Sequence, residues 1–147
     1  MYKRILILCT GNSCRSQMAE GFLKSFDQEL VVYSAGTNPV QQIHPFAVKV
    51  MAEAGIDLSE QYTKNVNQFI HKSFDYVITV CDNAKDECPL FMGNVKNKLH
   101  IGFEDPAGVT GTEEEILSAF RMTRDRIKNE FYKFYKSEIK DKKESVV

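Results

Sequence analysis

The sequence lacks the charge excess, the histidine spacing and the long apolar runs that are typical of several classes of protein. Its 147 residues carry 19 Lys and Arg against 20 Asp and Glu, a net charge of −1, so no basic excess points to nucleic acid or an anionic membrane. Its three histidines have no spacing typical of a metal site. The apolar run Ile5–Leu8 is too short for a signal peptide or a membrane span. We therefore expect a cytoplasmic monomer without cofactor, metal, nucleic-acid partner or membrane partner.

Internal repeats and low-complexity linkers are also missing from the sequence. A chain of this length forms one domain with a real core, which we assign to residues 1–139, followed by a charged tail at 140–147. The four cysteines do not imply a disulfide framework, because cytoplasmic thiols are normally reduced.

Hydrophobic patterning predicts alternating strands and helices. Strands are expected at 1–8, 31–33, 74–80 and, more weakly, 99–103. Helices are expected after residue 15, from Pro45 to Gly55, and after Thr112, which begins a capping box with Glu115. This order predicts an α/β fold: a single three-layer domain whose four-stranded parallel sheet has helices on both faces. Sites in such sheets lie beyond the carboxyl ends of the strands, where Cys9, Cys81 and Asp105 would meet.

The segment after the first strand reads Cys-Thr-Gly-Asn-Ser-Cys-Arg-Ser, from Cys9 to Ser16. A thiol between a strand and a helix N-terminus faces backbone N–H groups that stabilise a thiolate and a neighbouring oxyanion. The loop therefore predicts that Cys9 is a nucleophile attacking a phosphate-like centre. Arg15 would clamp the oxyanion with its planar guanidinium and help to keep Cys9 ionised.

The remaining loop residues have supporting roles in this interpretation. Gly11 allows a tight turn, and Asn12 shapes the loop through its side-chain amide. Ser16 would hydrogen-bond the sulfur of Cys9, whereas Ser13 is equally well explained as a helix cap. Cys14 is either a packed helix residue or a contributor of its backbone N–H. The predicted oxyanion-binding set is Thr10, Gly11, Asn12, Ser13, Cys14, Arg15 and Ser16.

Two further cysteines, Cys81 and Cys88, flank six polar, helix-compatible residues. If that stretch is one helix, their Cα atoms are about 10 Å apart along its axis, whereas a disulfide needs roughly 4.4–6.8 Å. The pair can bond only if the segment unwinds, so a redox role requires a mobile segment. The alternative is two unrelated cysteines. The cysteine spacings do not fit zinc.

Asp105 precedes Pro106 at the same predicted edge of the sheet. A carboxyl on this rigid step suits a general acid that protonates a leaving oxygen. Glu104 could do the same, and a turn aspartate is the simpler alternative.

These residues resemble a known family. The run from Cys9 to Glu20 is similar to the loop of thioredoxin-coupled arsenate reductases, which are related in fold to low-molecular-weight protein tyrosine phosphatases. The similarity continues through 33–36, 81–89 and 102–108 and covers nearly the whole chain. The loop alone does not separate reductase from phosphatase, whereas Cys81 and Cys88 together indicate a reductase.

The resemblance implies a thiol cascade. Cys9 attacks arsenate while Asp105 assists the departure of a hydroxyl, and phosphate or sulfate would bind as analogues. Cys81 then forms a disulfide with Cys9 and releases arsenite. Cys88 moves the disulfide to Cys81–Cys88, which thioredoxin reduces.

Some positions differ from the family patterns. Some members bind a monovalent cation near residues matching Asn12, Glu20 and Ser34; here Lys64 lies near the missing acidic position, and its ammonium would replace the cation. Ile101 stands where members often have tryptophan. The alternative function is a low-molecular-weight tyrosine phosphatase, although Gln17 and Ala107 replace the proline and tyrosine usual there. A non-enzymatic redox sensor is disfavoured, because sensing does not require Asp105.

Overall fold

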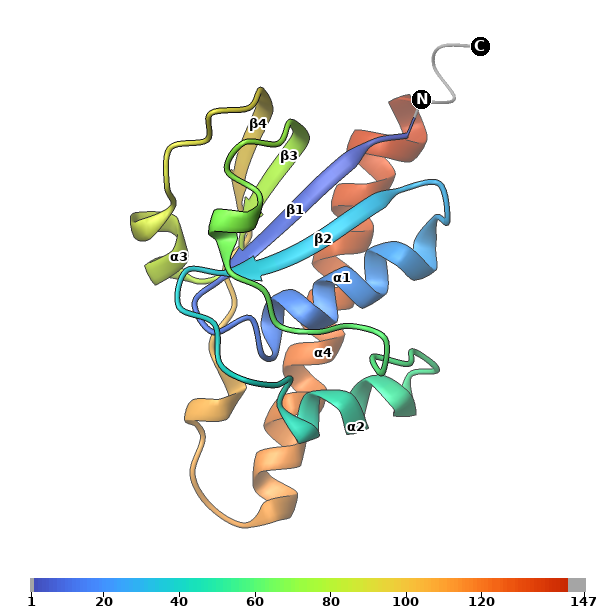
Figure 1. Cartoon of the computed structure of the whole chain (residues 1–147). Helices are drawn as coiled ribbons and strands as arrows, with labels where there is room; N and C mark the ends of the chain where they lie inside the picture. Colours follow the sequence, from blue (N-terminus) through green and yellow to red (C-terminus); the bar gives the residue numbers. More distant parts are fainter. Residues whose placement is uncertain (1, 143–147) are drawn as a thin grey trace.

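The computed structural model describes residues 2–142. Its elements are β1 (Arg4–Cys9), α1 (Arg15–Phe26), β2 (Val31–Gly36), α2 (Pro45–Glu53), η1 (Val66–Gln68), β3 (Phe74–Thr79), α3 (Asp82–Glu87), β4 (Val95–His100), η2 (Pro106–Gly108), α4 (Glu113–Tyr135) and η3 (Lys136–Lys140) (Figure 1). The strands form one parallel sheet in the order β2-β1-β3-β4. The predicted α/β fold is confirmed.

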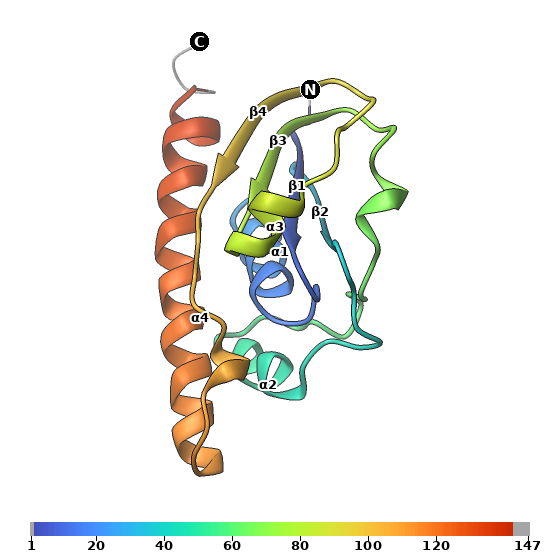
Figure 2. The same ribbon diagram turned by 90° about the vertical axis from the view of Figure 1, so that its left-hand side faces the viewer.

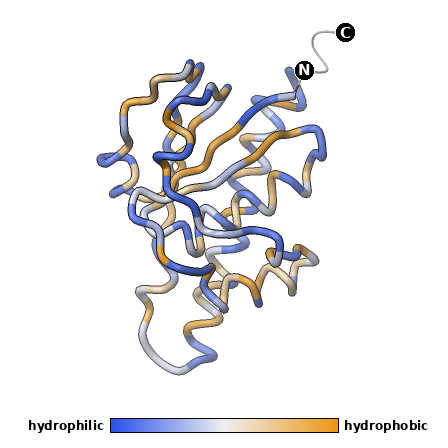
Figure 3. Tube along the Cα trace, in the orientation of Figure 1, coloured by the Kyte–Doolittle hydropathy of each residue, from blue (hydrophilic) through white to orange (hydrophobic). Residues whose placement is uncertain are grey.

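Helices cover both faces of this sheet, as Figure 2 shows with α4 on one side and the segment around η1 on the other. Tyr76 of β3 packs edge-on against Phe134 of α4, with ring centroids 5.0 Å apart. On the opposite side, Tyr33 of β2 contacts Phe69, which follows η1, at 5.3 Å. β1 is therefore buried from Ile5 to Cys9, and the hydropathy tube is hydrophobic along this central strand (Figure 3).

The helix ends follow the sequence signals. Thr112 Oγ1 accepts a hydrogen bond from the backbone N–H of Glu115 at 3.2 Å, and the Glu115 carboxylate accepts one from the N–H of Thr112. Gly55 takes a φ of 81° just after α2, a left-handed conformation that suits glycine at a helix end. Both predicted boundaries are confirmed.

The fourth strand differs from its prediction. It runs from Val95 to His100 rather than over 99–103. Because β4 is an edge strand with exposed Lys96, Asn97 and Lys98, its sequence has no apolar run to mark it. Its backbone pairing with β3 determines its position.

The C-terminal end also extends further than the patterning indicated. After η3 the helix continues to residue 142, so positions 140–142 of the predicted tail are helical, and the rest of the tail lies outside the described residues. Within residues 2–142, no helix combines the length and apolar character needed to cross a membrane.

Candidate active site

The loop between β1 and α1 is held by one buried asparagine. Asn12 has a φ of 53°, which asparagine tolerates better than most residues. Its Nδ2 donates to Ser16 Oγ at 2.8 Å and to Ser34 Oγ at 2.9 Å, and its Oδ1 accepts from the backbone N–H of Lys64 at 2.9 Å. All its side-chain polar atoms are satisfied at 0% exposure, so the loop is pre-shaped.

Two loop assignments change. Ser16 was predicted to contact the sulfur of Cys9, but its Oγ accepts the hydrogen bond from Asn12. Gly11 was predicted to make the tight turn, but the left-handed residue is Asn12, and a Cβ at Gly11 would make only ordinary contacts.

The close approach occurs instead at Gly36, the last residue of β2. A Cβ there would lie 2.4 Å from the carbonyl oxygen of Thr10 and 3.1 Å from Asn12 Cβ. β2 can therefore lie against the loop only because this position has no side chain. Nothing in the local sequence reveals this requirement, because the contact is made across the fold.

The start of α1 provides hydrogen-bond donors. Cys14 is the N-cap residue and no side chain caps the helix, so the first N–H groups of α1 are open to an anion. Ser13, considered as a cap, instead has its Oγ 3.6 Å from Cys14 Sγ. These positions fit an oxyanion cradle.

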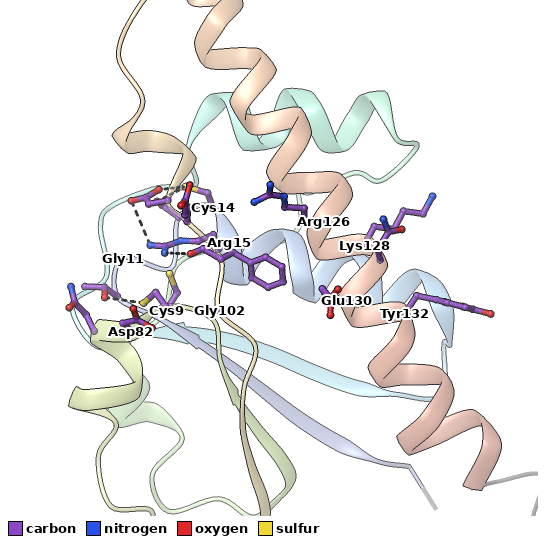
Figure 4. Close-up of a pocket in the computed structure, with 18 of the residues that line it drawn as sticks. Cys9, Gly11, Cys14, Arg15, Asp82, Gly102, Arg126, Lys128, Glu130 and Tyr132 are labelled. Atoms are coloured by element: carbon purple, nitrogen blue, oxygen red, sulfur yellow. Dashed lines mark hydrogen bonds and ion pairs between the residues drawn. The ribbon is translucent and has the colours of Figure 1, made fainter.

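Arg15 extends from this helix start into the pocket (Figure 4). Its Nη1 donates to the carbonyl oxygen of Phe103 at 3.0 Å, and its Nη2 lies 3.6 Å from Asp105 Oδ2. Its buried Nε has no hydrogen-bond partner among the described residues. A bound oxyanion would satisfy this donor, which a guanidinium presents in a fixed plane.

Asp105, the residue just before η2, lies beside Arg15. Its Oδ1 accepts a hydrogen bond from the N–H of Ala107 at 3.0 Å, and its side chain is 47% exposed. The Sγ of Cys14 lies 3.9 Å from the same oxygen. Glu104, the alternative acid, makes no ion pair or hydrogen bond among residues 2–142, so Asp105 is the carboxyl oriented toward Arg15.

Cys9 and Cys81 come together, as the topology predicted. Both thiols are buried and line the same pocket. The neighbouring Cys81 sulfur and burial raise the pKa of Cys9, although Arg15 acts in the opposite direction. The Cys9 thiol, together with Thr10 Oγ1 at 3.4 Å and the N–H of Ala84, lowers the pKa of Cys81 to about 5.

The directions of these shifts differ from the expectation that the loop keeps Cys9 ionised, because the pKa of Cys9 is raised and that of Cys81 is lowered. Hydrogen-bond donors to the Cys81 sulfur favour its thiolate, whereas burial disfavours the charged form of Cys9. Ionising Cys9 therefore requires the proton to move within the pair or to the bound anion.

Cys88 lies at the other end of α3 from Cys81, so the stretch between them, which the sequence left open, is helical. All four cysteines are free thiols. Burial raises the pKa of Cys88, partly offset by the ammonium of Lys98. Cys88 is thus near the site in sequence but is separated from Cys81 by α3.

A buried charged cluster lies behind the loop. The Nζ of Lys64 is 4.0 Å from Glu20 Oε1 and donates to the carbonyl oxygen of Tyr62 at 2.6 Å. Ser34 Oγ donates to the same Glu20 oxygen at 2.7 Å. Burial lowers the pKa of Lys64, while Glu20 raises it. Among residues 2–142, no three His, Cys, Asp or Glu side chains gather as a metal site.

These groups open into a pocket of about 1650 Å³. Cys9, Cys81, Arg15 and Asp105 line one end, and α4 lines the other, where Figure 4 shows Arg126 and Tyr132. The thiol pair, the cradle and the carboxyl therefore face one shared space.

The family of the chain follows from comparison. The model described as "Low molecular weight phosphotyrosine protein phosphatase" matches residues 4–145. The chain belongs to this family.

Within the phosphatase family, arsenate reductases are similar to this chain. The arsenate reductase of Halalkalibacterium halodurans is 48% identical over 126 residues, or 85% of this chain and 89% of the relative. A structure described as an arsenate reductase in oxidized state has a TM-score of 0.74 at 31% identity, covering 88% of this chain and 93% of that one. Another, in the phosphate binding state, has a TM-score of 0.69 at 30% identity, covering 90% and 95%. The resemblance inferred from the sequence is confirmed.

Proposed function

We propose that this protein reduces arsenate to arsenite. The observation that carries the proposal is the second thiol, Cys81, which lines the same pocket as Cys9 at the base of the oxyanion cradle. Hydrolysis of a phosphate ester needs a nucleophile, an arginine and an acid, but no second thiol. The similarity to arsenate reductases and the phosphate-bound relative support the same substrate class.

Cys9 begins the reaction in this proposal. The bound oxyanion or Cys81 takes the Cys9 proton, and the resulting thiolate attacks arsenic. A hydroxyl leaves as water with a proton from Asp105, while Arg15 and the N–H groups of α1 hold the remaining oxygens. The product is a covalent adduct between Cys9 and pentavalent arsenic.

Cys81 completes the reduction. Its thiolate attacks the sulfur of Cys9, a Cys9–Cys81 disulfide forms, and the sulfur–arsenic bond breaks. The bonding electron pair stays on arsenic, which leaves as trivalent arsenite. Two thiols have been oxidised by two electrons and one arsenic reduced by two, so the step balances.

Cys88 then resolves the disulfide. Its thiolate attacks Cys81, which frees Cys9 and leaves a Cys81–Cys88 disulfide. Because α3 separates these residues, the helix must unwind. An external dithiol protein, for which we propose thioredoxin, returns both cysteines to thiols. We propose that the protein is a monomer in the cytoplasm, where the reducing environment supports this cycle.

Two assays on the same preparation test the proposal. One measures NADPH oxidation with thioredoxin, thioredoxin reductase and arsenate; the other measures hydrolysis of an aryl phosphate. We expect sustained arsenate-dependent oxidation, and mass spectrometry should find Cys81–Cys88 disulfide when thioredoxin is withheld. Fast aryl-phosphate hydrolysis without arsenate turnover would instead establish the phosphatase alternative, which would use the same Cys9, Arg15 and Asp105 and which the family membership supports.

A further inference from the structure

His100, the last residue of β4, is outside the reaction described above yet has both ring nitrogens engaged. Its Nδ1 lies 2.8 Å from Thr79 Oγ1, and its Nε2 lies 3.2 Å from Asp82 Oδ1. A carboxylate only accepts hydrogen bonds, so Nε2 carries the hydrogen that it donates to Asp82. Thr79 fixes the ring orientation, and Asp82 receives the directed donor.

Thr79 and Asp82 flank Cys81 in the sequence. Thr79 ends β3 two positions before Cys81, and Asp82 begins α3 one position after it. The backbone reinforces the arrangement, because the N–H of Ile101 donates to the carbonyl oxygen of Thr79 at 2.9 Å. His100 therefore connects the sheet to the first residue of α3, across the position where Cys81 sits.

Gly102 makes room for this connection. A Cβ at residue 102 would lie 2.8 Å from His100 Nε2 and 3.4 Å from its Cε1. No left-handed φ calls for glycine here. The missing side chain leaves space for the imidazole, so the sequence around His100 is fitted to its position.

The connection matters because α3 is otherwise weakly held. Six residues are too few for a stable isolated helix, and within α3 only Ala84 is buried. Cys81 gives the helix no side-chain cap. At the far end, Thr37 Oγ1 donates to Glu87 at 3.2 Å. Asp82 and Glu87 thus tie opposite ends of α3, and of the two only Asp82 is next to Cys81, the thiol that reacts with Cys9.

We propose that His100 is a positioning residue for Cys81: by tying Asp82 to the sheet it keeps the Cys81 sulfur beside Cys9 for the first thiol exchange. This deepens the proposed function and rests on it. The same tie opposes the unwinding of α3 that the second exchange requires. Without the contact between His100 and Asp82, the Cys9–Cys81 disulfide forms more slowly, and its transfer to Cys88 is as fast as before or faster. General damage to the fold would instead slow both thiol exchanges.

The first experiment isolates the first exchange. In a Cys88→Ser background, arsenate is added, the reaction is quenched by alkylation, and the Cys9–Cys81 disulfide is followed by mass spectrometry. His100→Ala should slow its formation about two- to fivefold, the range expected for an exposed pair. Gly102→Ala, which displaces the imidazole without removing it, should also slow it. His100→Gln, whose amide can still donate to Asp82, should restore most of the rate.

Glu87→Gln is the matched control, because it weakens the tie at the other end of α3. It should leave the rate of Cys9–Cys81 formation unchanged. Amide hydrogen exchange in the reduced protein, without arsenate, provides a second readout: residues 82–84 should exchange faster in His100→Ala than in wild type. The proposal would be overturned if His100→Ala matched wild type both in the rate of Cys9–Cys81 formation and in the amide exchange of residues 82–84. It would also be overturned if, in protein that retains Cys88, His100→Ala slowed Cys9–Cys81 formation and the later Cys81–Cys88 formation equally.

These outcomes are separable from failure of the proposed function. If the Cys88→Ser protein with His100 intact forms no disulfide with arsenate, the arsenate chemistry is wrong. The thiol oxidant diamide, itself reduced to a hydrazine, then drives Cys9–Cys81 formation in place of arsenate. The same ranking of His100→Ala, Gly102→Ala, His100→Gln and Glu87→Gln would support the positioning role; no difference among them would refute it.

Discussion

The loop from Cys9 to Ser16 and the segment from Cys81 to Met92 both carry thiols of the proposed cascade, yet they are built in opposite ways. The loop is fixed by Asn12, whose side chain makes three buried hydrogen bonds. The second segment has one buried residue in its helix, and Leu90 and Met92 are 83% and 72% exposed after it. Binding an anion needs donors already in place, whereas disulfide transfer needs a segment that can leave its place.

The largest expected effect is at the rigid loop. Cys9→Ser should abolish arsenate turnover, because a hydroxyl at neutral pH is a far poorer nucleophile than a thiolate. The thioredoxin-linked assay measures the loss, and retained phosphate binding shows that the cradle is intact. Turnover near the wild-type rate would show that Cys9 is not the nucleophile, and the loop would then not differ from the second segment in the way proposed.

Cys88→Ser tests the segment from Cys81 to Met92. Without a resolving thiol, the protein should perform about one turnover and stop with Cys9 linked to Cys81. Aryl-phosphate hydrolysis by the reduced variant should survive, since it needs only Cys9, Arg15 and an acid. Sustained thioredoxin-linked turnover would contradict the cascade and favour the phosphatase alternative.

Arg15→Lys should sharply weaken anion binding, because a point charge cannot reproduce the planar fork. The measurement is protection of Cys9 by phosphate against alkylation. In wild type, rising phosphate should slow the alkylation; in Arg15→Lys the same protection should need much more phosphate. Identical protection curves would mean that the guanidinium does not hold the anion.

Stability should separate the two regions as well. Asn12→Ala removes three buried hydrogen bonds and should lower the free energy of unfolding by about 2–4 kcal/mol. Glu87→Gln, at the exposed end of α3, should change it by less than about 0.5 kcal/mol. Urea denaturation measures both. Similar losses in the two variants would show that α3 is held as firmly as the loop.

The smallest effect concerns the charge of the thiol pair. Because the pKa of Cys81 is lowered to about 5, its alkylation rate should fall as pH drops through that value. Thr10→Val removes one donor to the sulfur and should move the midpoint upward by about one unit. Peptide mass spectrometry after iodoacetamide treatment reads the midpoint. Thr110→Val, at an exposed threonine outside the loop, should not move it.

Sequence reasoning reached those features that follow from periodicity and local chemistry. Buried β1 and the capping box at Thr112 each have a pattern along the chain, and strand order then brings Cys9 and Cys81 to one edge. The six residues between Cys81 and Cys88 were only compatible with a helix in the sequence, and the structure shows that they form one.

The remainder depends on contacts across the fold. The approach of Gly36 to Thr10 and the bond from Asn12 to Ser16 join residues whose proximity appears only after folding. The position of β4 is set by pairing with β3 rather than by its own residues. Similarly, the lowered pKa of Cys81 depends on which donors surround its sulfur, and spacing along the sequence cannot show this.

The place of β4 at the edge of the sheet has a consequence for how the protein behaves at high concentration. An edge strand offers unpaired backbone groups to other molecules, and lysines are a common safeguard against edge-to-edge association. Lys96 and Lys98 alternate along this strand, and Lys98 lies over Phe91 of the neighbouring segment at 6.0 Å. In the proposed cycle α3 unwinds during disulfide transfer, and we expect these two lysines to limit the association of molecules through β4 at that stage.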